Sequence, residues 1–201
     1  MRKAAVQWHP RFAEWRDLFR RHPEWFVAWR GTFFRFQTVD FPVPKEILSG
    51  EGARQHGGRW NPPGLGALYG SLTESTALAE CKANDRYYGV NNRSPRLLVA
   101  IEAQLNWVLD LTNPATRRLL KVTLAELGSE DWRKLQNAGK ESFTQAIGRA
   151  VAVVGGSGLL ARSAAIPQGM NVVIFPGAVA SDRLEVMDGI KLEALGFRPK
   201  A

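Results

Sequence analysis

The chain has 201 residues, 45% of them hydrophobic, so we expect one folded domain with a real core. The net charge is +8 without a single basic block, which argues against a DNA-binding tail and leaves a solvated basic surface, a phosphate-bearing ligand or an acidic partner. One cysteine excludes an internal disulfide, and three scattered histidines match no metal-ligand spacing. We therefore expect no metal site. We also expect a soluble, cytoplasmic protein, because the start does not resemble a secretory signal and no apolar run approaches the roughly 20 residues that span a bilayer.

Residues 1–30 are rich in tryptophan and predict a helical extension ahead of a main domain at 31–201. Phe12, Trp15 and Phe19 recur at spacings of three and four, the pattern of an amphipathic helix with arginines on its other side. The simplest interpretation is a helix packed on its own domain. The alternative is a docking face for a partner or a second copy, since Trp and Arg are favoured at interfaces.

The segment 31–38, GTFFRFQT, predicts a strand on which Phe34 faces one way and Arg35 the other. A long ordered loop is expected over 40–66, and it contains the motif GGRWNPPG at 57–64. Its glycines and prolines would hold polar groups still. We expect Arg59 to point to a ligand and Trp60 to pack beneath the loop, while Asn61 bonds to nearby backbone.

The segment 66–71 predicts a short strand that carries Tyr69. A helix is then expected to begin near Ser71, because Glu74 follows at the spacing of a capping box, and Glu80 lies in its third turn. Further strands are predicted within 96–112 and at 159–163, 171–177 and 183–188, the last as an edge strand, with mostly helix over 114–154. Helices mixed with short strands, without a βαβ repeat, indicate an α+β fold.

Five polar side chains from separate elements form the candidate site: Arg35, Arg59, Tyr69, Glu80 and Ser163. Guanidinium forks suit a pyrophosphate, and a tyrosine offers a flat face and a hydroxyl. A carboxylate can stabilise positive charge on a sugar carbon, and a serine can bind phosphate or ribose. This set fits a nucleotide-sugar ligand better than a peptide or DNA. The GGSG run at 155–158 is not a dinucleotide fingerprint, because its expected strand and helix stand in the reverse order.

Taken together, the motifs GGRWNPPG, ALYGS, TALAE and GLLARSAA…GMNVVIFP resemble the RES domain in order and spacing, over about residues 30–180. The resemblance implies a core like that of ADP-ribosyltransferases, two small mixed or antiparallel sheets flanked by helices. It also implies a toxin of a bacterial toxin–antitoxin pair that consumes NAD. The implied partner is a helix-turn-helix, Xre-type antitoxin that blocks the NAD cleft, and DNA would be reached only through that antitoxin.

The resemblance also assigns roles to the five candidate residues. Arg35 matches the family's first arginine, Arg59 the basic residue of the Gly-Gly motif, Tyr69 the strand tyrosine, Glu80 the helix glutamate and Ser163 the late serine. Phe34 stands where the family usually has a tyrosine, so a hydroxyl is missing there. Glu80, Arg59 and Tyr69 are therefore expected to be catalytic, and Arg35, Arg59, Tyr69 and Ser163 to bind NAD.

The expected reaction breaks the bond between nicotinamide and ribose, with NAD as substrate and no cofactor. Water, phosphate or a protein side chain could accept the ADP-ribose. An NAD glycohydrolase or phosphorylase is the first reading, an ADP-ribosyltransferase with a protein target the second, and a non-catalytic nucleotide- or antitoxin-binding module the third. The oligomeric state, including a homo-oligomer, is left open.

Overall fold

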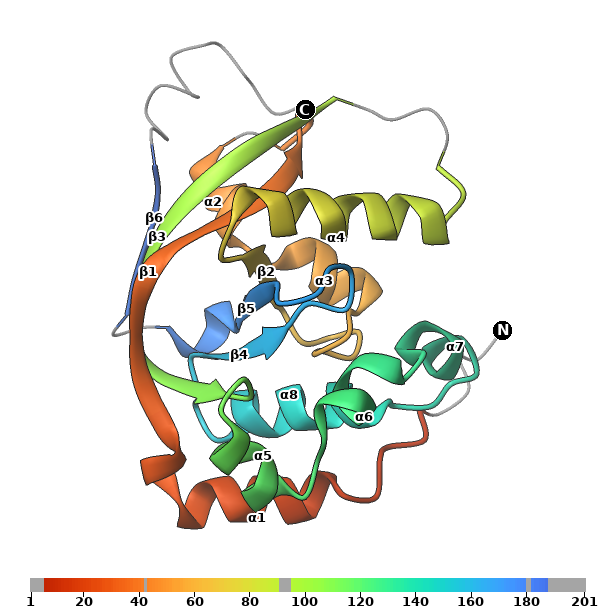
Figure 1. Cartoon of the computed structure of the whole chain (residues 1–201), viewed down its shortest axis with the longest axis vertical. Coiled ribbons are helices and arrows are strands. Elements are labelled where there is room, and N and C mark those ends of the chain that lie inside the picture. Colours follow the sequence, from red (N-terminus) through yellow and green to blue (C-terminus); the bar gives the residue numbers. More distant parts are fainter. Residues whose placement is uncertain (1–5, 42, 91–94, 180–181, 188–201) are drawn as a thin grey trace.

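A computed structural model describes residues 6–41, 43–90, 95–179 and 182–187 (Figure 1). Its six strands are β1 (Phe26–Thr38), β2 (Leu68–Ser71), β3 (Arg96–Asp110), β4 (Gly158–Arg162), β5 (Met170–Ile174) and β6 (Arg183–Val186). They are hydrogen-bonded in the order β1-β2-β5-β4-β3-β6, and β1 also pairs with β3. The pair β3–β4 is parallel and the other pairs are antiparallel.

The predicted α+β class is confirmed, but the strands form one curved sheet where we expected two small ones. The cause is the length of β1 and β3, which have 13 and 15 residues. They pair along most of that length, from Phe26–Leu109 to Thr38–Arg96. Because β1 also reaches β2 through the pair Phe34–Ser71, the strands close into a ring, with β6 added outside β3. The predicted edge strand is thus confirmed over 183–186, while Asp188 lies outside the described residues.

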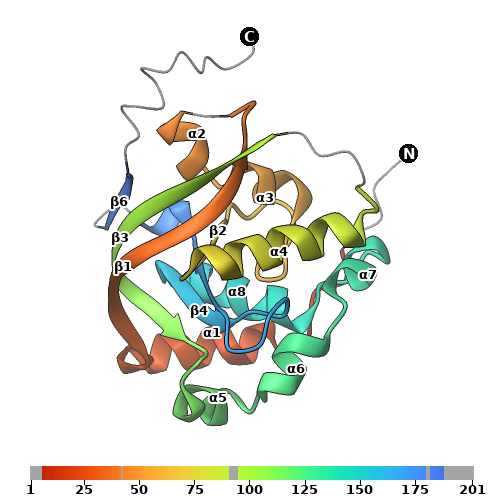
Figure 2. The same cartoon turned by 45° about the horizontal axis from the view of Figure 1, so that its top comes forward.

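Eight α-helices are described: α1 (Phe12–Arg21), α2 (Pro44–Leu48), α3 (Glu51–His56), α4 (Glu74–Tyr87), α5 (Pro114–Leu120), α6 (Leu124–Ser129), α7 (Trp132–Asn137) and α8 (Phe143–Val153). Single 3-10 turns occur at Pro23–Trp25 and Pro176–Ala178. Helix α4 packs against β1 and β2, and α1 lies along α8 (Figures 1 and 2). None of the helices in the described ranges is both long and apolar enough to cross a membrane.

The amphipathic helix predicted near the N-terminus is confirmed as α1, and it packs on its own domain. Trp15 and Phe19 are fully buried in the core that α8 and one face of the sheet enclose. Strand β1 also starts at Phe26, so it crosses the 30/31 boundary that the sequence suggested. The Trp-rich segment therefore shares a core with the residues that follow it.

Two local predictions differ from the structure. The expected loop over 40–66 contains the short helices α2 and α3. Helix α4 begins at Glu74, with Thr73 as its N-cap accepting the N–H of Thr76 at 3.2 Å, and not near Ser71. Ser71 is the last residue of β2, where pairing with the neighbouring strands holds it in extended conformation.

Candidate active site

We call the loop 57–64 the Arg59 loop. Hydrogen bonds between its polar groups and the residues around it hold the loop in one conformation. Asn61 is fully buried, and its side-chain amide donates to the carbonyls of Ala53 and Leu65, both at 2.8 Å. Its Oδ1 accepts the Tyr69 hydroxyl at 2.7 Å, and the same hydroxyl accepts the N–H of Trp60 at 2.8 Å. The predicted structural role of Asn61 is confirmed, and the hydroxyl of Tyr69 is used in holding the loop.

Helix α8 supports the Arg59 loop from beneath. The buried side chain of Gln145 donates to the carbonyls of Gly58 at 3.0 Å and Asn61 at 3.3 Å. Gly148 lies so close to the loop that an added Cβ would stand 1.8 Å from the Trp60 carbonyl oxygen. Trp60 is buried in the core, as we predicted. The position of Arg59 is therefore set by long-range packing on both sides of the loop.

Arg59 itself is half-buried and binds the backbone at the end of α6. Its Nη1 donates to the carbonyls of Leu127 at 3.1 Å and Glu130 at 3.4 Å. Burial lowers the pKa of Arg59 and the nearby charge of Arg133 lowers it further, while Glu80 acts in the opposite direction. An arginine remains a cation at neutral pH under such shifts, so Arg59 places a fixed positive charge near Glu80.

Glu80 lies at the centre of a group of polar side chains that we call the Glu80 cluster: Glu80, Ser163, Asn171 and Ser71. The Ser163 hydroxyl and the Asn171 side-chain amide donate to Oε1 of Glu80 at 2.7 and 2.6 Å. The Ser71 hydroxyl in turn donates to Oδ1 of Asn171 at 2.8 Å. Both bonds to Glu80 reach the same oxygen, so no described contact occupies Oε2. This leaves one carboxylate oxygen of a half-buried glutamate for a ligand.

The sheet brings these residues together because they share one face. Tyr69 and Ser71 alternate with Leu68 and Gly70 on β2, and Ser71 pairs with Asn171 on β5. Helix α4 packs over the same face and supplies Glu80. Four of the five predicted residues, Arg59, Tyr69, Glu80 and Ser163, are thus assembled in one region.

Arg35 is not brought to this region. On β1 its neighbour Phe34 pairs with Ser71, so Arg35 points to the opposite face of the sheet, where it pairs with Val99. Its Nη1 donates to the carbonyl of Ile47 in α2 at 3.2 Å. Burial on that face lowers the pKa of Arg35 to about 10. Of the two arginines predicted to bind NAD, only Arg59 therefore lies close enough to Glu80 for their charges to interact.

Ser71 and Asn171 were missed by sequence reasoning. Asn171 stands within the motif GMNVVIFP, two residues before the buried Val173 and therefore on the same face of β5. A polar residue at a core-facing strand position was the signal that could have identified it. Among the described residues no group of three or more His, Cys, Asp or Glu side chains is arranged to hold a metal ion.

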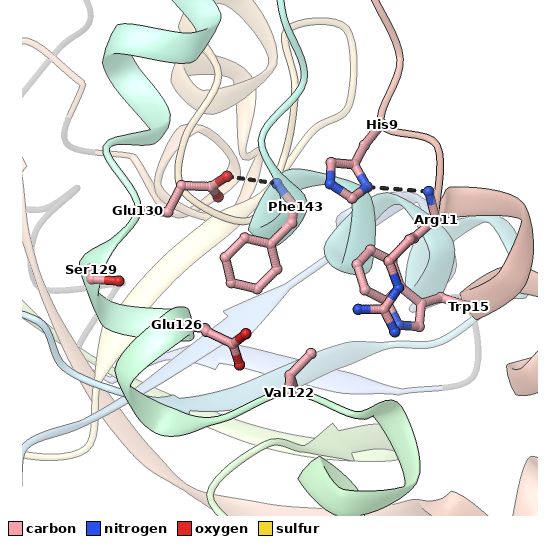
Figure 3. Close-up of a pocket in the computed structure, with 8 residues that line it drawn as sticks. All are labelled: His9, Arg11, Trp15, Val122, Glu126, Ser129, Glu130 and Phe143. Carbon is pink, nitrogen blue, oxygen red and sulfur yellow. Dashed lines mark hydrogen bonds between the residues drawn. The ribbon is translucent and has the colours of Figure 1, made fainter.

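A separate cavity of about 320 Å³ lies next to α1 and α6 (Figure 3). The residues that line it are His9, Arg11, Trp15, Val122, Glu126, Ser129, Glu130 and Phe143. None of the predicted site residues is among them. Glu130 connects this cavity with the Arg59 region. Its carboxylate accepts a hydrogen bond from the N–H of Phe143 at 3.2 Å, and its carbonyl accepts one from Arg59.

The fold and the Glu80 cluster define an α+β protein with a carboxylate held beside a fixed guanidinium group. The sequence model of the RES domain matches residues 32–193, and the chain belongs to the RES domain family. It is 30% identical over 142 residues to proteins named NAD(+) phosphorylase MbcT from Mycobacterium tuberculosis (strain H37Rv) and Mycobacterium bovis, covering 67% of this chain and 73% of each relative.

A solved structure shares the fold. The crystal structure of the M. tuberculosis MbcT–MbcA toxin–antitoxin complex contains a chain that matches 93% of this one, with 97% of that chain covered. The TM-score is 0.60 at 20% sequence identity. The match includes most of the chain, so the fold is that of a chain in this solved complex.

Proposed function

We propose that this protein is the toxin of a toxin–antitoxin pair and consumes NAD by transferring its ADP-ribose to inorganic phosphate. The observation that carries the proposal is the Glu80 cluster, in which two hydrogen bonds orient one carboxylate while Arg59 lies close enough for their charges to interact. The names of the mycobacterial relatives support phosphate as the acceptor. NAD is the substrate in this proposal, and no further cofactor takes part.

In the proposed reaction the bond between nicotinamide nitrogen and ribose carbon breaks, and its electron pair stays with nicotinamide. Nicotinamide leaves as a neutral molecule, so no general acid is required. Positive charge then develops on the ribose carbon, and Oε2 of Glu80 stabilises it. A preorganised charge of this kind contributes about 3–4 kcal/mol to lowering a barrier. A phosphate oxygen then bonds to that carbon and gives ADP-ribose 1″-phosphate.

The other residues of the site hold Glu80 and the substrate in place. Ser163 and Asn171 fix the carboxylate, which saves the cost of ordering it during reaction. Arg59 binds a phosphate group of the dinucleotide through its planar fork. Tyr69 keeps the Arg59 loop in place through its hydroxyl, which leaves its ring as the part that can contact nicotinamide or ribose.

The test is mass spectrometry of the products after purified protein is incubated with NAD, with and without inorganic phosphate. We expect nicotinamide together with a phosphorylated ADP-ribose when phosphate is present, and little release of nicotinamide when it is left out. Free ADP-ribose at the same rate in both would indicate water as the acceptor, and labelled protein would indicate transfer to a side chain. The variant Glu80→Gln keeps the shape of the side chain and removes its charge. Loss of NAD cleavage in a folded Glu80→Gln protein would show that the reaction requires the charge.

We also propose a helix-turn-helix, Xre-type antitoxin as the partner and the cytoplasm, where NAD is available, as the place of action. A solved toxin–antitoxin complex with this fold supports the pairing, and the net charge of +8 suits an acidic partner. Co-expression with a neighbouring small gene tests it. The expected result is rescue of growth and a complex that does not release nicotinamide from NAD.

A further inference from the structure

Arg133, in the first turn of α7, lies among aromatic rings from its own helix and from the end of α4. Its guanidinium carbon lies 4.4 Å from the ring centroids of Tyr87 and Trp132, and 5.6 Å from that of Tyr88. Its Nη2 donates to Oδ1 of Asn84 at 2.9 Å. Stacking of this kind holds a guanidinium group in one plane and keeps its charge. Arg133 thus joins α7 to the end of α4. Figure 2 shows where these two helices lie in the fold.

This position is close to the Glu80 cluster. Asn84 follows Glu80 by four residues on α4, so the two side chains are neighbours on one helix face, about 5–6 Å apart at Cβ. Glu130, whose carbonyl accepts Arg59, precedes Arg133 by only three residues. The end of α7 is also tied to the segment before the Arg59 loop.

That tie is a hydrogen bond between Gln136 and His56. The side-chain amide of Gln136 donates to the carbonyl of His56 at 2.9 Å, and its Oε1 accepts Gln145 at 2.8 Å. Helix α7 therefore shares supports with the loop that carries Arg59. Two guanidinium groups, those of Arg59 and Arg133, are thus held by the same supports near the Glu80 carboxylate.

Two like charges held in this way oppose each other. Burial is the main cause that lowers the pKa of Arg59, and the charge of Arg133 lowers it further. Nε of Arg133 is buried without a hydrogen-bond partner among the described residues. The fold keeps both cations in place with Glu80 and Glu130 as the acidic groups that act on Arg59, and the Glu130 carboxylate already accepts the N–H groups of Phe143 and Thr144. An anion between the two arginines would remove the repulsion, and phosphate oxygens match the planar donors of arginine.

We propose that Arg133 is a second phosphate-binding residue of this site and acts together with Arg59. The inference rests on the proposed function, which supplies two sources of phosphate groups: the pyrophosphate of NAD and the inorganic phosphate that accepts ADP-ribose. Both offer the same chemistry to a guanidinium pair, and kinetics can distinguish them. Sequence reasoning did not single out Arg133, because nothing in WRKLQN shows that its neighbours are Tyr87 and Asn84 from α4.

The kinetic test measures NAD cleavage by the full chain at varied NAD and varied phosphate. Arg133→Met keeps the packing of the side chain and removes the charge, and Arg133→Lys keeps the charge without the fork. The matched control is Arg86→Ala, which removes an exposed arginine from the same end of α4. Loss of charge-assisted hydrogen bonds predicts that Arg133→Met raises one KM by about 10- to 100-fold, with Arg133→Lys between it and the wild type.

A higher KM for NAD identifies the pyrophosphate, and a higher KM for phosphate identifies the acceptor. Unchanged values for both, in a variant whose thermal unfolding matches the wild type, overturn the inference. If Arg133→Met unfolds at assay temperature, Arg133→Lys alone must show the raised KM or the inference fails.

A binding experiment separates this inference from the proposed function. Calorimetry with ADP-ribose and, separately, with inorganic phosphate does not depend on turnover. We expect Arg133→Met to bind one of them at least about 10-fold more weakly than the wild type and Arg86→Ala to bind both equally well. If the wild type does not cleave NAD but this difference in binding is observed, the proposed reaction is wrong and the phosphate site is supported. Equal binding by all three proteins removes the phosphate site.

Discussion

Ser163 donates its hydroxyl hydrogen to Oε1 of Glu80 at 2.7 Å, and its oxygen accepts the N–H groups of Ala165 and Ile166 at 3.0 and 3.3 Å. A hydroxyl has one hydrogen and two lone pairs, so the capacity of Ser163 is filled by the protein. The serine predicted to bind ribose or phosphate is therefore placed to orient Glu80 within the folded chain. It can bind substrate only by giving up one of these bonds.

The variant Ser163→Ala tests this positioning role. Removal of one hydrogen bond to a carboxylate costs about 1.5–3 kcal/mol, so we expect kcat to fall by about 10- to 100-fold. The KM for NAD should change little if the hydroxyl serves only to orient Glu80, because all its described hydrogen bonds are to the protein. The exposed Ser75 on the same helix as Glu80 gives the control, Ser75→Ala, which should behave as the wild type. A raised KM with unchanged kcat would instead show that Ser163 binds the substrate.

Gly148→Ala tests whether the Arg59 loop depends on α8. Because the new Cβ would stand 1.8 Å from the Trp60 carbonyl oxygen, backbone must move, and overpacking of this kind costs about 1–3 kcal/mol or more. We expect a lower midpoint of urea unfolding and weaker NAD binding. The control is Gly52→Ala in α3, where an added Cβ meets nothing within 4 Å and better helix propensity contributes up to about 1 kcal/mol. Equal stability of the two variants would show that the loop does not rest on the helix.

Tyr69→Phe tests the hydroxyl that fixes the same loop. The variant leaves the buried Oδ1 of Asn61 and the N–H of Trp60 without this partner, which costs about 1–3 kcal/mol for an unsatisfied buried group. We expect a lower unfolding midpoint together with a higher KM for NAD, because Arg59 loses its fixed position. Tyr88→Phe is the control, since Tyr88 is 60% exposed. A loss of kcat with full stability would instead indicate that the Tyr69 hydroxyl takes part in the reaction.

Local signals were enough to predict part of the site. The motif GGRWNPPG predicted a rigid loop with Asn61 bonded to backbone, because glycine, proline and asparagine fix the chain over a few residues. The strand of Tyr69 and the helix of Glu80 were likewise predicted, although the capping-box spacing placed the start of the helix near Ser71 and not at Glu74. These predictions needed only contacts close in sequence or a match of motifs.

The remainder depends on contacts between distant segments. Arg35 looked equivalent to Arg59 in the sequence, yet only the pairing of Phe34 with Ser71 shows that Arg35 occupies the face of β1 turned away from the Glu80 cluster. Ser71 and Asn171 meet across 100 residues of chain. The closure of β1 and β3 into one curved sheet decides these meetings, and no local pattern specifies it.

The stability of the N-terminal packing should depend on pH through His9. Burial lowers the pKa of His9 below its ordinary value of 6.5, although Glu130 and Glu141 act in the opposite direction. Its Nδ1 accepts the N–H of Arg11 at 3.3 Å, which requires the neutral ring, and the ring stacks on Trp15 at 5.5 Å. The unfolded chain therefore takes up the proton more readily than the folded one, so stability is present above pH 6.5 and is lost as the pH falls below it.

The variant His9→Phe isolates this contribution. Phenylalanine keeps an aromatic ring to stack on Trp15 and cannot bind a proton, so its stability should fall less between about pH 8 and pH 5.5 than that of the wild type. The measurement is the urea midpoint across this range, with the value at about pH 8, where the histidine is neutral in both states, as internal reference. Parallel curves for the two proteins would mean that His9 takes up its proton equally well in the folded chain. Burial beside Trp15 would then cost the protonated ring nothing, and the acid sensitivity of the fold would have to come from its carboxylates.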